Sequence, residues 1–273
     1  MTVAIPETRF DTAFAARRAQ SAPGLIPYFT AGYPLHDSLG DLLRAAERTG
    51  CMAAEVGIPF SDPLADGPTI QRTGQVALHN GMTLGIALNQ VNKARLRGVS
   101  LPVAVMTYVN PVLSFGVEAF AREASAAGVD GVILPDLPLD EAADIRRALH
   151  GAGVAMIPLV APTTTPDRLA RICSTGAAFV YCVGVTGVTG ARRTVSGDAF
   201  ALLDSVRAVT PLPRALGFGL STHEHLEALR GHAEAAVVGS ALLDAVGVDP
   251  DEPVAAAERF LGAMIGREAA HPG

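Results

Sequence analysis

Two carboxylates close to one short apolar run are the residues best suited to acid–base chemistry. Glu55 lies in the run 53–56, and Asp66 lies in the proline-rich stretch after it. A buried carboxylate without a partner is costly, so Glu55 either has partners or has a raised pKa. Two hypotheses follow: a structural ion pair for Glu55 with Asp66 as a helix N-cap, or general acid–base catalysis by two carboxylates in different environments.

Two glycine-containing segments toward the C-terminus predict a phosphate site. Gly217-Phe-Gly-Leu-Ser221 and Gly239-Ser240 each come at the end of an apolar run. Glycine lets the backbone approach a ligand, and N–H groups at the start of a helix carry partial positive charge. Isolated glycines are more often turn residues, but the occurrence of two such segments favours a phosphate cradle.

A third stretch, 184–197, is rich in Gly, Thr and Ser, which does not suit a regular helix or strand. It predicts either a mobile lid over the site or a solvated loop. The composition of the loop does not decide between the two.

Several other chemistries lack the residues that they need. The single lysine, Lys93, is expected on the outer face of a helix, so no lysine is placed to form a Schiff base. The close pair His223 and His225 has no third ligand at metal spacing, which predicts no metal site. The three cysteines are interpreted as reduced core residues, and the sequence contains no Gly-x-Ser-x-Gly nucleophile turn. Acid–base catalysis on a phosphorylated small molecule remains.

The elements that must position these residues follow a repeating pattern. Capped amphipathic helices are predicted at 37–50, 139–151 and 165–176, and Ser221-Thr-His-Glu224 has the form of a capping box. Between the helices lie apolar runs without polar alternation, as in strands buried on both faces. These runs are 25–30, 53–56, 102–108, 131–135, 155–160, 178–183, 214–218 and 235–239.

Eight such strands separated by helices predict a (β/α)₈ barrel, the TIM-barrel fold, with extra helices near the two ends of the chain at 6–20 and 254–267. In a barrel, the C-terminal ends of the strands carry the chemistry. A doubly wound sheet is the alternative, but its Gly-x-Gly-x-x-Gly turn is absent after the first strand.

Composition limits the class of protein further. The 273 residues are 49% hydrophobic and 18% charged, without a linker or low-complexity tract, so we expect a single domain over 1–273. The net charge of −6 argues against a nucleic-acid partner. No apolar run is long enough to span a membrane, and charged residues stand where a signal peptide is apolar, so we expect a soluble, cytoplasmic protein.

Four motifs, taken in order, carry a resemblance to a known family. They are GIPFSDPLADGPTIQ (57–71) with Glu55 just before it, VTGVTGAR (185–192), GFGLS (217–221) and VVGS (237–240). Together they resemble the tryptophan synthase α-subunit family. PYFTAGYP (27–34), MTYVNP (106–111) and LPDLPLDE (134–141) extend the resemblance over most of the chain.

The resemblance implies an activity in L-tryptophan biosynthesis: retro-aldol cleavage of indole-3-glycerol phosphate to indole and D-glyceraldehyde 3-phosphate, without metal or lysine. Glu55 is then the general acid–base that protonates indole C3 and assists removal of the glycerol hydroxyl proton. Asp66 would accept the indole N–H and stabilise the positive charge of the indolenine.

The resemblance also implies a set of binding residues. Around the indole it places Tyr28, Tyr108 and Tyr181; at the phosphate it places Gly190, Gly219, Gly239 and Ser240; and in the lid it places Thr189. The sequence departs from the family at His232-Ala-Glu-Ala-Ala236, where Ala-Asp-Gly is expected, and at Val56, where Leu is usual. Neither departure affects the expected chemistry.

The family's partner is a β subunit that carries pyridoxal phosphate and receives the indole, so the resemblance implies an α2β2 heterotetramer. This chain itself would hold no cofactor. Asp62, Pro63, Asn110 and Pro138 match positions that face the β subunit. Two alternatives remain: a stand-alone indole-releasing lyase of the same chemistry, and a catalytically silent phosphate-binding barrel that regulates a partner. The presence of both Glu55 and Asp66 argues against the silent barrel.

Overall fold

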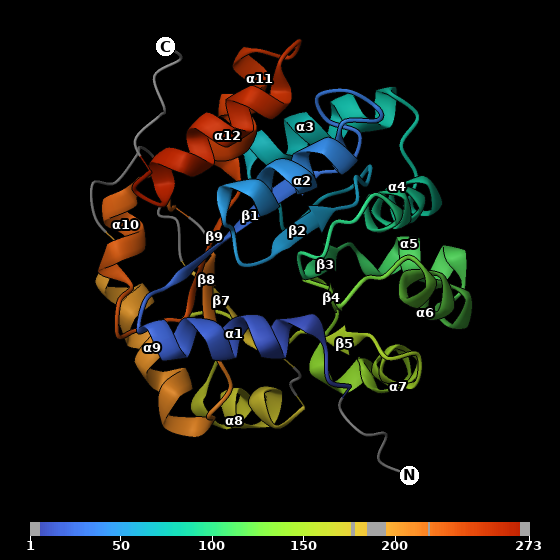
Figure 1. The fold of residues 1–273 in the computed structure, drawn as a ribbon. Helices are drawn as coiled ribbons and strands as arrows, with labels where there is room; N and C mark the ends of the chain where they lie inside the picture. Colours follow the sequence, from blue (N-terminus) through green and yellow to red (C-terminus); the bar gives the residue numbers. More distant parts are fainter. Residues whose placement is uncertain (1–5, 176–177, 185–194, 218, 268–273) are drawn as a thin grey trace.

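The apolar runs form one curled parallel sheet (Figure 1). The computed structural model describes residues 6–175, 178–184, 195–217 and 219–267, and within them nine strands pair in the order β5-β4-β3-β2-β1-β9-β8-β7-β6. The strands are β1 (Gly24–Thr30), β2 (Ala54–Gly57), β3 (Val103–Met106), β4 (Gly131–Ile133), β5 (Ala155–Met156), β6 (Leu159–Val160), β7 (Val180–Val183), β8 (Arg214–Gly217) and β9 (Ala235–Val238).

The two edges of this sheet are halves of one barrel strand. β5 and β6 are separated only by Ile157 and Pro158, and Pro158 has no N–H to donate. The Ile157 N–H donates to the Val132 carbonyl at 2.9 Å, and the Pro158 carbonyl accepts the Tyr181 N–H at 2.9 Å. The sheet therefore closes at this point. The ends of the nine strands agree within two residues with the eight predicted runs, which confirms the (β/α)₈ barrel and excludes the doubly wound sheet.

Helices surround the sheet (Figure 1), and the predicted ones are found near their expected positions, although the first residues of the helix predicted at 139–151 form a separate 3₁₀ turn. They are α1 (Arg9–Gln20), α2 (Leu39–Thr49), α3 (Pro68–His79), α4 (Leu84–Leu96), α5 (Val109–Phe115), α6 (Val117–Ala126), the 3₁₀ turn η1 (Leu139–Glu141), α7 (Ala143–Gly151), α8 (Pro166–Ser174), α9 (Gly197–Val209), α10 (His223–Ala228), α11 (Ser240–Val248) and α12 (Pro253–Met264). The extra helices α1 and α12 confirm the expected additions to the barrel.

One predicted helix start is wrong by one residue. Thr222, not Ser221, is the N-cap of α10, and its hydroxyl accepts the His225 N–H. Glu224 is therefore the second helical residue rather than the third, so it cannot complete the predicted capping box. Two hydroxyl residues stand side by side here, and either suits an N-cap.

Helix α1 closes the end of the barrel at which the strands begin. Its Phe10 and Phe14 pack against Phe179, which directly precedes β7, with ring centroids 5.2 and 5.0 Å apart. Asp130, which directly precedes β4, receives the guanidinium of Arg9 at 2.9 Å. This end is filled by packing, which leaves the opposite end, where the strands terminate, for a site.

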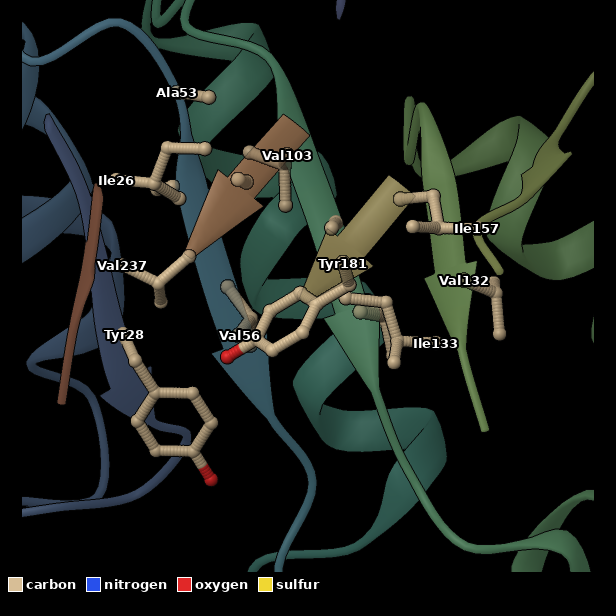
Figure 2. Close-up of a cluster of buried hydrophobic side chains, with 14 of the residues drawn as sticks. Ile26, Tyr28, Ala53, Val56, Val103, Val132, Ile133, Ile157, Tyr181 and Val237 are labelled. Carbon is tan, nitrogen blue, oxygen red and sulfur yellow. The ribbon is translucent and has the colours of Figure 1, made fainter. Parts of the chain in front are cut away.

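The core, which lies inside the barrel and between the sheet and its helices, is built mainly from small and branched aliphatic side chains. Figure 2 shows Ile26, Val56, Val103, Ile133 and Val237, from several strands, in one buried cluster. The rings of Tyr28 and Tyr181 belong to the same cluster. Cys51, Cys173 and Cys182 are buried, as expected of core residues.

Candidate active site

A cavity of about 720 Å³ lies at the C-terminal ends of the strands. It brings together these predicted residues: Tyr28, Glu55, Asp66, Tyr181, Gly219, Gly239 and Ser240. Its wall also includes residues that the sequence analysis did not single out as site residues: Thr69, Ile70, Met106, Pro135, Leu159, Leu220 and Asp244 among them. Most of these carry apolar side chains, so the cavity suits a ligand with an apolar body.

Glu55 lies on β2, opposite Tyr28 on β1 and Ala104 on β3. Its side chain is 1% exposed, and neither carboxyl oxygen has a hydrogen-bond partner among the described residues. Burial, and then the charge of Asp66, raise the pKa of Glu55 to about 8. The group is therefore mostly protonated at neutral pH, and the ion-pair hypothesis finds no support in the described part of the chain.

Asp66 lies in the loop before α3 and is half-buried. Its backbone is held at both ends, because its N–H donates to the Pro63 carbonyl and its carbonyl accepts the Gln71 side-chain amide. Burial raises the pKa of Asp66 to about 6, and a hydrogen bond from the Tyr108 hydroxyl opposes the shift. The N-cap hypothesis is wrong, because Gly67 occupies that position in α3.

The two carboxyl groups thus differ in protonation within one cavity. Near pH 7, Glu55 carries a proton that it can donate, whereas Asp66 is mostly ionised. Such a pair can supply a proton to one point of a substrate and negative charge to another. This division is what the acid–base hypothesis requires.

Tyr108 lies under the loop that carries Asp66 and is not among the residues that line the cavity. It is 5% exposed, its hydroxyl accepts the Ala65 N–H at 3.0 Å, and its ring packs on Phe60 with centroids 5.4 Å apart. The structure therefore places Tyr108 as a support for the loop. Its predicted contact with the indole stays a prediction.

Tyr28 and Tyr181 each lie against a glycine of the neighbouring strand. A Cβ atom at Gly57 would overlap the Tyr28 hydroxyl, and one at Gly217 would overlap the Tyr181 hydroxyl. Gly217 belongs to the segment predicted to bind phosphate, and no role was predicted for Gly57. The missing side chains make room for the two rings, a role that no local pattern in the sequence indicates.

Two backbone segments face the cavity as a candidate phosphate cradle. Gly219 has φ +77°, which favours glycine, and Leu220 and Ser221 continue the wall. Across the cavity, α11 begins at Ser240, so the N–H groups of its first turn have no acceptor within the helix. Exposed N–H groups on two sides suit a phosphate.

Two predicted site residues, Thr189 and Gly190, lie outside the described residues, as does most of the predicted lid at 184–197. Lys93 is exposed on α4, as expected. Within the described ranges, no group of His, Cys, Asp and Glu could hold a metal ion. No described helix is long and apolar enough to cross a membrane.

A second cavity, of about 380 Å³, lies between α7 and α8 and shares Pro135, Leu159 and Ala161 with the first. It contains none of the predicted catalytic or substrate-binding residues. The candidate active site is therefore the larger cavity.

Comparison with known proteins identifies relatives over nearly the whole chain. The family described as "Tryptophan synthase alpha chain" matches residues 14–269. The tryptophan synthase alpha chain of Roseiflexus castenholzii is 44% identical over 260 residues, which cover 95% of this chain and 100% of the relative. That of Chloroflexus aggregans is 43% identical, covering 94% of this chain and 97% of the relative.

Solved structures agree with these relatives. A chain of Mycobacterium tuberculosis tryptophan synthase superposes with a TM-score of 0.87 at 36% identity, covering 95% of this chain and 98% of that one. A chain of the tryptophan synthase α2β2 complex from Pyrococcus furiosus superposes with a TM-score of 0.85 at 38% identity, covering 90% and 98% respectively.

Proposed function

This chain belongs to the tryptophan synthase alpha chain family, and we propose how its own residues carry out the family's reaction. The family cleaves indole-3-glycerol phosphate, and this chain is a carbon–carbon lyase of that type in tryptophan biosynthesis. The roles of individual residues in this chain are the proposal. The observation that carries it is the buried carboxyl group of Glu55, which has no hydrogen-bond partner among the described residues and lies in one cavity with Asp66.

Glu55 performs both proton transfers. In its protonated form it donates a proton to indole C3, which converts the ring to an indolenine cation. The resulting carboxylate then accepts the proton of the glycerol hydroxyl beside the ring. The C–C bond breaks as the aldehyde forms, and its electron pair returns to the ring. Indole and glyceraldehyde 3-phosphate leave, and Glu55 is protonated again, so the cycle consumes no external acid or base.

Asp66 stabilises the charged intermediate. Protonation at C3 puts positive charge on the indole nitrogen, and the ionised carboxylate accepts the N–H there. The half-buried position of Asp66 strengthens this interaction because less water competes with it than at the surface. Tyr28 and Tyr181 supply apolar ring surface for the indole, and Gly219, Gly239 and Ser240 receive the phosphate, which holds the other end of the substrate.

Activity of the purified chain toward indole-3-glycerol phosphate tests these roles. We expect Glu55→Gln to lower kcat by ~10²–10⁴-fold or more, because the amide is similar in shape but transfers no proton. Asp66→Asn keeps a hydrogen-bond acceptor but removes the charge, so it should also be severely impaired. A Glu55→Gln enzyme that keeps more than about half of the normal rate would refute the acid–base role.

We infer a partner as well. A β subunit that holds pyridoxal phosphate would accept the indole, in an α2β2 assembly like that named for the Pyrococcus furiosus protein. This chain would then need no cofactor of its own. Two exposed side chains support a docking face near the partner-matching positions: Leu64, 93% exposed, follows Asp62 and Pro63, and Leu113, 56% exposed, lies one turn after Asn110.

We also propose a cytoplasmic location, because unpaired buried cysteines suit a reducing compartment.

Binding of the β subunit should hold the loop that carries Asp66 and raise turnover. Coupling is reciprocal, so a non-cleavable substrate analogue must tighten the complex by the factor by which the β subunit tightens analogue binding. Titration of the β subunit with and without the analogue measures both effects. Equal subunit affinity in the two titrations, with turnover unchanged by the partner, would favour a stand-alone lyase.

A further inference from the structure

His225 lies directly behind the candidate phosphate cradle. It is in the first turn of α10 and is only 3% exposed. Its Nδ1 atom accepts the backbone N–H of Ser221 at 3.2 Å. The Thr222 hydroxyl accepts the His225 N–H at 3.4 Å, so two hydrogen bonds tie the loop to the start of the helix.

The bond to Ser221 requires one form of the ring. A backbone N–H can be accepted only by an unprotonated ring nitrogen, so this bond is made by the neutral imidazole with its proton on Nε2. The ring is not among the residues that line the cavity. It therefore acts on the loop from behind and does not touch a ligand in the cavity.

Because of this bond, the backbone N–H groups of residues 219–221 differ in whether they are available to a ligand. The Ser221 N–H is turned to His225 and is not available to a ligand. The N–H groups of Gly219 and Leu220 have no acceptor among the described residues. Adjacent peptide planes share the backbone angles between them, so holding the Ser221 amide restrains the plane before it, next to the left-handed turn at Gly219.

We propose that His225 is a positioning residue for the phosphate group of the substrate. By holding the Ser221 amide, it keeps the Gly219–Leu220 backbone in the orientation that presents free N–H groups to the cavity. The inference rests on the proposed function, because it presumes that this loop receives the phosphate. A cradle that is fixed before binding loses less conformational freedom when the phosphate arrives.

The same helix carries a matched control residue. His223, two positions earlier, bonds to the Met264 carbonyl at 3.0 Å, so its contact is with the end of α12 and not with the loop. A substitution at His223 alters the attachment of α10 to the rest of the barrel without removing the bond to Ser221.

Binding of glycerol phosphate and of indole, measured separately by calorimetry, tests the proposal. His225→Phe keeps a ring but removes the acceptor, and we expect it to weaken glycerol phosphate binding about tenfold while indole affinity stays within about twofold, the effect of one lost hydrogen bond. His225→Asn places an oxygen near the position of Nδ1 and should restore most of the affinity. His223→Phe should leave both affinities unchanged. In turnover, His225→Phe should raise KM more than it lowers kcat.

Each contrary result has a distinct meaning. If Gly219→Val weakens glycerol phosphate binding but His225→Phe does not, the positioning role is wrong and the phosphate site stands. If His225→Phe weakens indole and glycerol phosphate equally, or if His225→Asn fails to restore binding while its thermal unfolding matches that of the native chain, the role is also wrong. If Gly219→Val leaves glycerol phosphate affinity unchanged, the phosphate assignment itself fails.

Discussion

The two ends of the barrel each contain a buried carboxyl group, and the two groups differ in their hydrogen-bond partners. Asp130, at the end where the strands begin, is 4% exposed and accepts bonds from Arg9 at 2.9 Å, Arg95 at 3.0 Å and the Val103 N–H at 2.9 Å. Glu55, on the strand that leads to the other end, is 1% exposed and has no partner among the described residues. A buried carboxylate whose hydrogen bonds are all made cannot lose a partner without cost to the fold, whereas a buried carboxyl group without such partners is available for chemistry.

The same contrast extends to other polar groups at the two ends of the barrel. At the closed end, Glu234, which precedes β9, pairs with Arg214 at 2.9 Å and also accepts its backbone N–H. At the open end, Asp66, Tyr28 and Tyr181 lie around the cavity, where burial raises the pKa of all three. At the closed end the polar groups pair with one another, whereas at the open end they line a cavity in which a ligand can bind.

The largest effect on folding should follow removal of the satisfied carboxylate. Asp130→Ala leaves Arg95, whose side chain is 11% exposed, without its carboxylate partner, and we expect the free energy of unfolding to fall by about 3–5 kcal/mol. The kcat per folded molecule should change by less than about threefold. Urea denaturation and turnover, measured on the same preparation, check both. The exposed pair of Asp144 and Arg147 is the control, since Asp144→Ala should cost less than about 1 kcal/mol.

Replacing the unpartnered Glu55 by a neutral glutamine is expected to have the opposite effect on the free energy of unfolding. The pKa of Glu55 is raised to about 8 in the fold, above its value in the unfolded chain, so ionisation opposes folding. As pH rises from about 5 to 8, the unfolded state holds the ionised form while the native state keeps its proton, and the native chain loses stability. Glu55→Gln removes that loss.

The variant should therefore unfold like the native chain near pH 4 and be more stable above pH 8, by an amount on the order of a few kcal/mol. Thermal unfolding of both proteins across this range measures the difference. A stability difference that does not change between pH 4 and pH 9 would show that Glu55 titrates normally.

Two glycines, one at each end of the barrel, allow the same comparison through substitutions with smaller expected effects. A Cβ atom at Gly131, beside Asp130, would lie 2.6 Å from Cδ1 of Ile157, so Gly131→Ala should destabilise the fold. At Gly239 the nearest atom to a Cβ is in Tyr28 at an ordinary 3.5 Å, so Gly239→Ala should fold normally. Because its methyl group would enter the cavity, we expect glycerol phosphate to bind about tenfold more weakly. A normal affinity would make Gly239 only a turn residue.

The barrel and most of the cavity were predictable from the sequence for identifiable physical reasons. Apolar runs without alternation are typical of strands buried on both faces, so the strands were predictable. Glu55 and Asp66 were predictable because Glu55 lies near the end of an apolar run and Asp66 lies in the motif that directly follows it. Asp130 was not singled out, because its partners Arg9 and Arg95 are distant in sequence. Local patterns carry no information on such contacts.

Dependence on contacts between different elements also explains why the roles of several other residues were not predicted. Gly57 and Gly217 are required by rings on neighbouring strands, and the bond from Ser221 to His225 depends on a side-chain orientation that a capping pattern does not specify. Tyr108 was predictable as an aromatic residue at a strand end. Its position under the loop that carries Asp66 depends on the path of that loop, which the sequence pattern does not specify.

The titration of Glu55 tests the central claim most directly. The claim is that this carboxyl group keeps its proton at neutral pH because it is buried, has no hydrogen-bond partner in the described part of the chain, and lies near the charge of Asp66. Carbon-13 NMR of glutamate-labelled protein, with the signal assigned by its loss in Glu55→Gln, gives the pKa. We predict a midpoint of about 8 that falls in Asp66→Asn. A midpoint in the ordinary range of an exposed glutamate, unchanged by Asp66→Asn, would contradict the account.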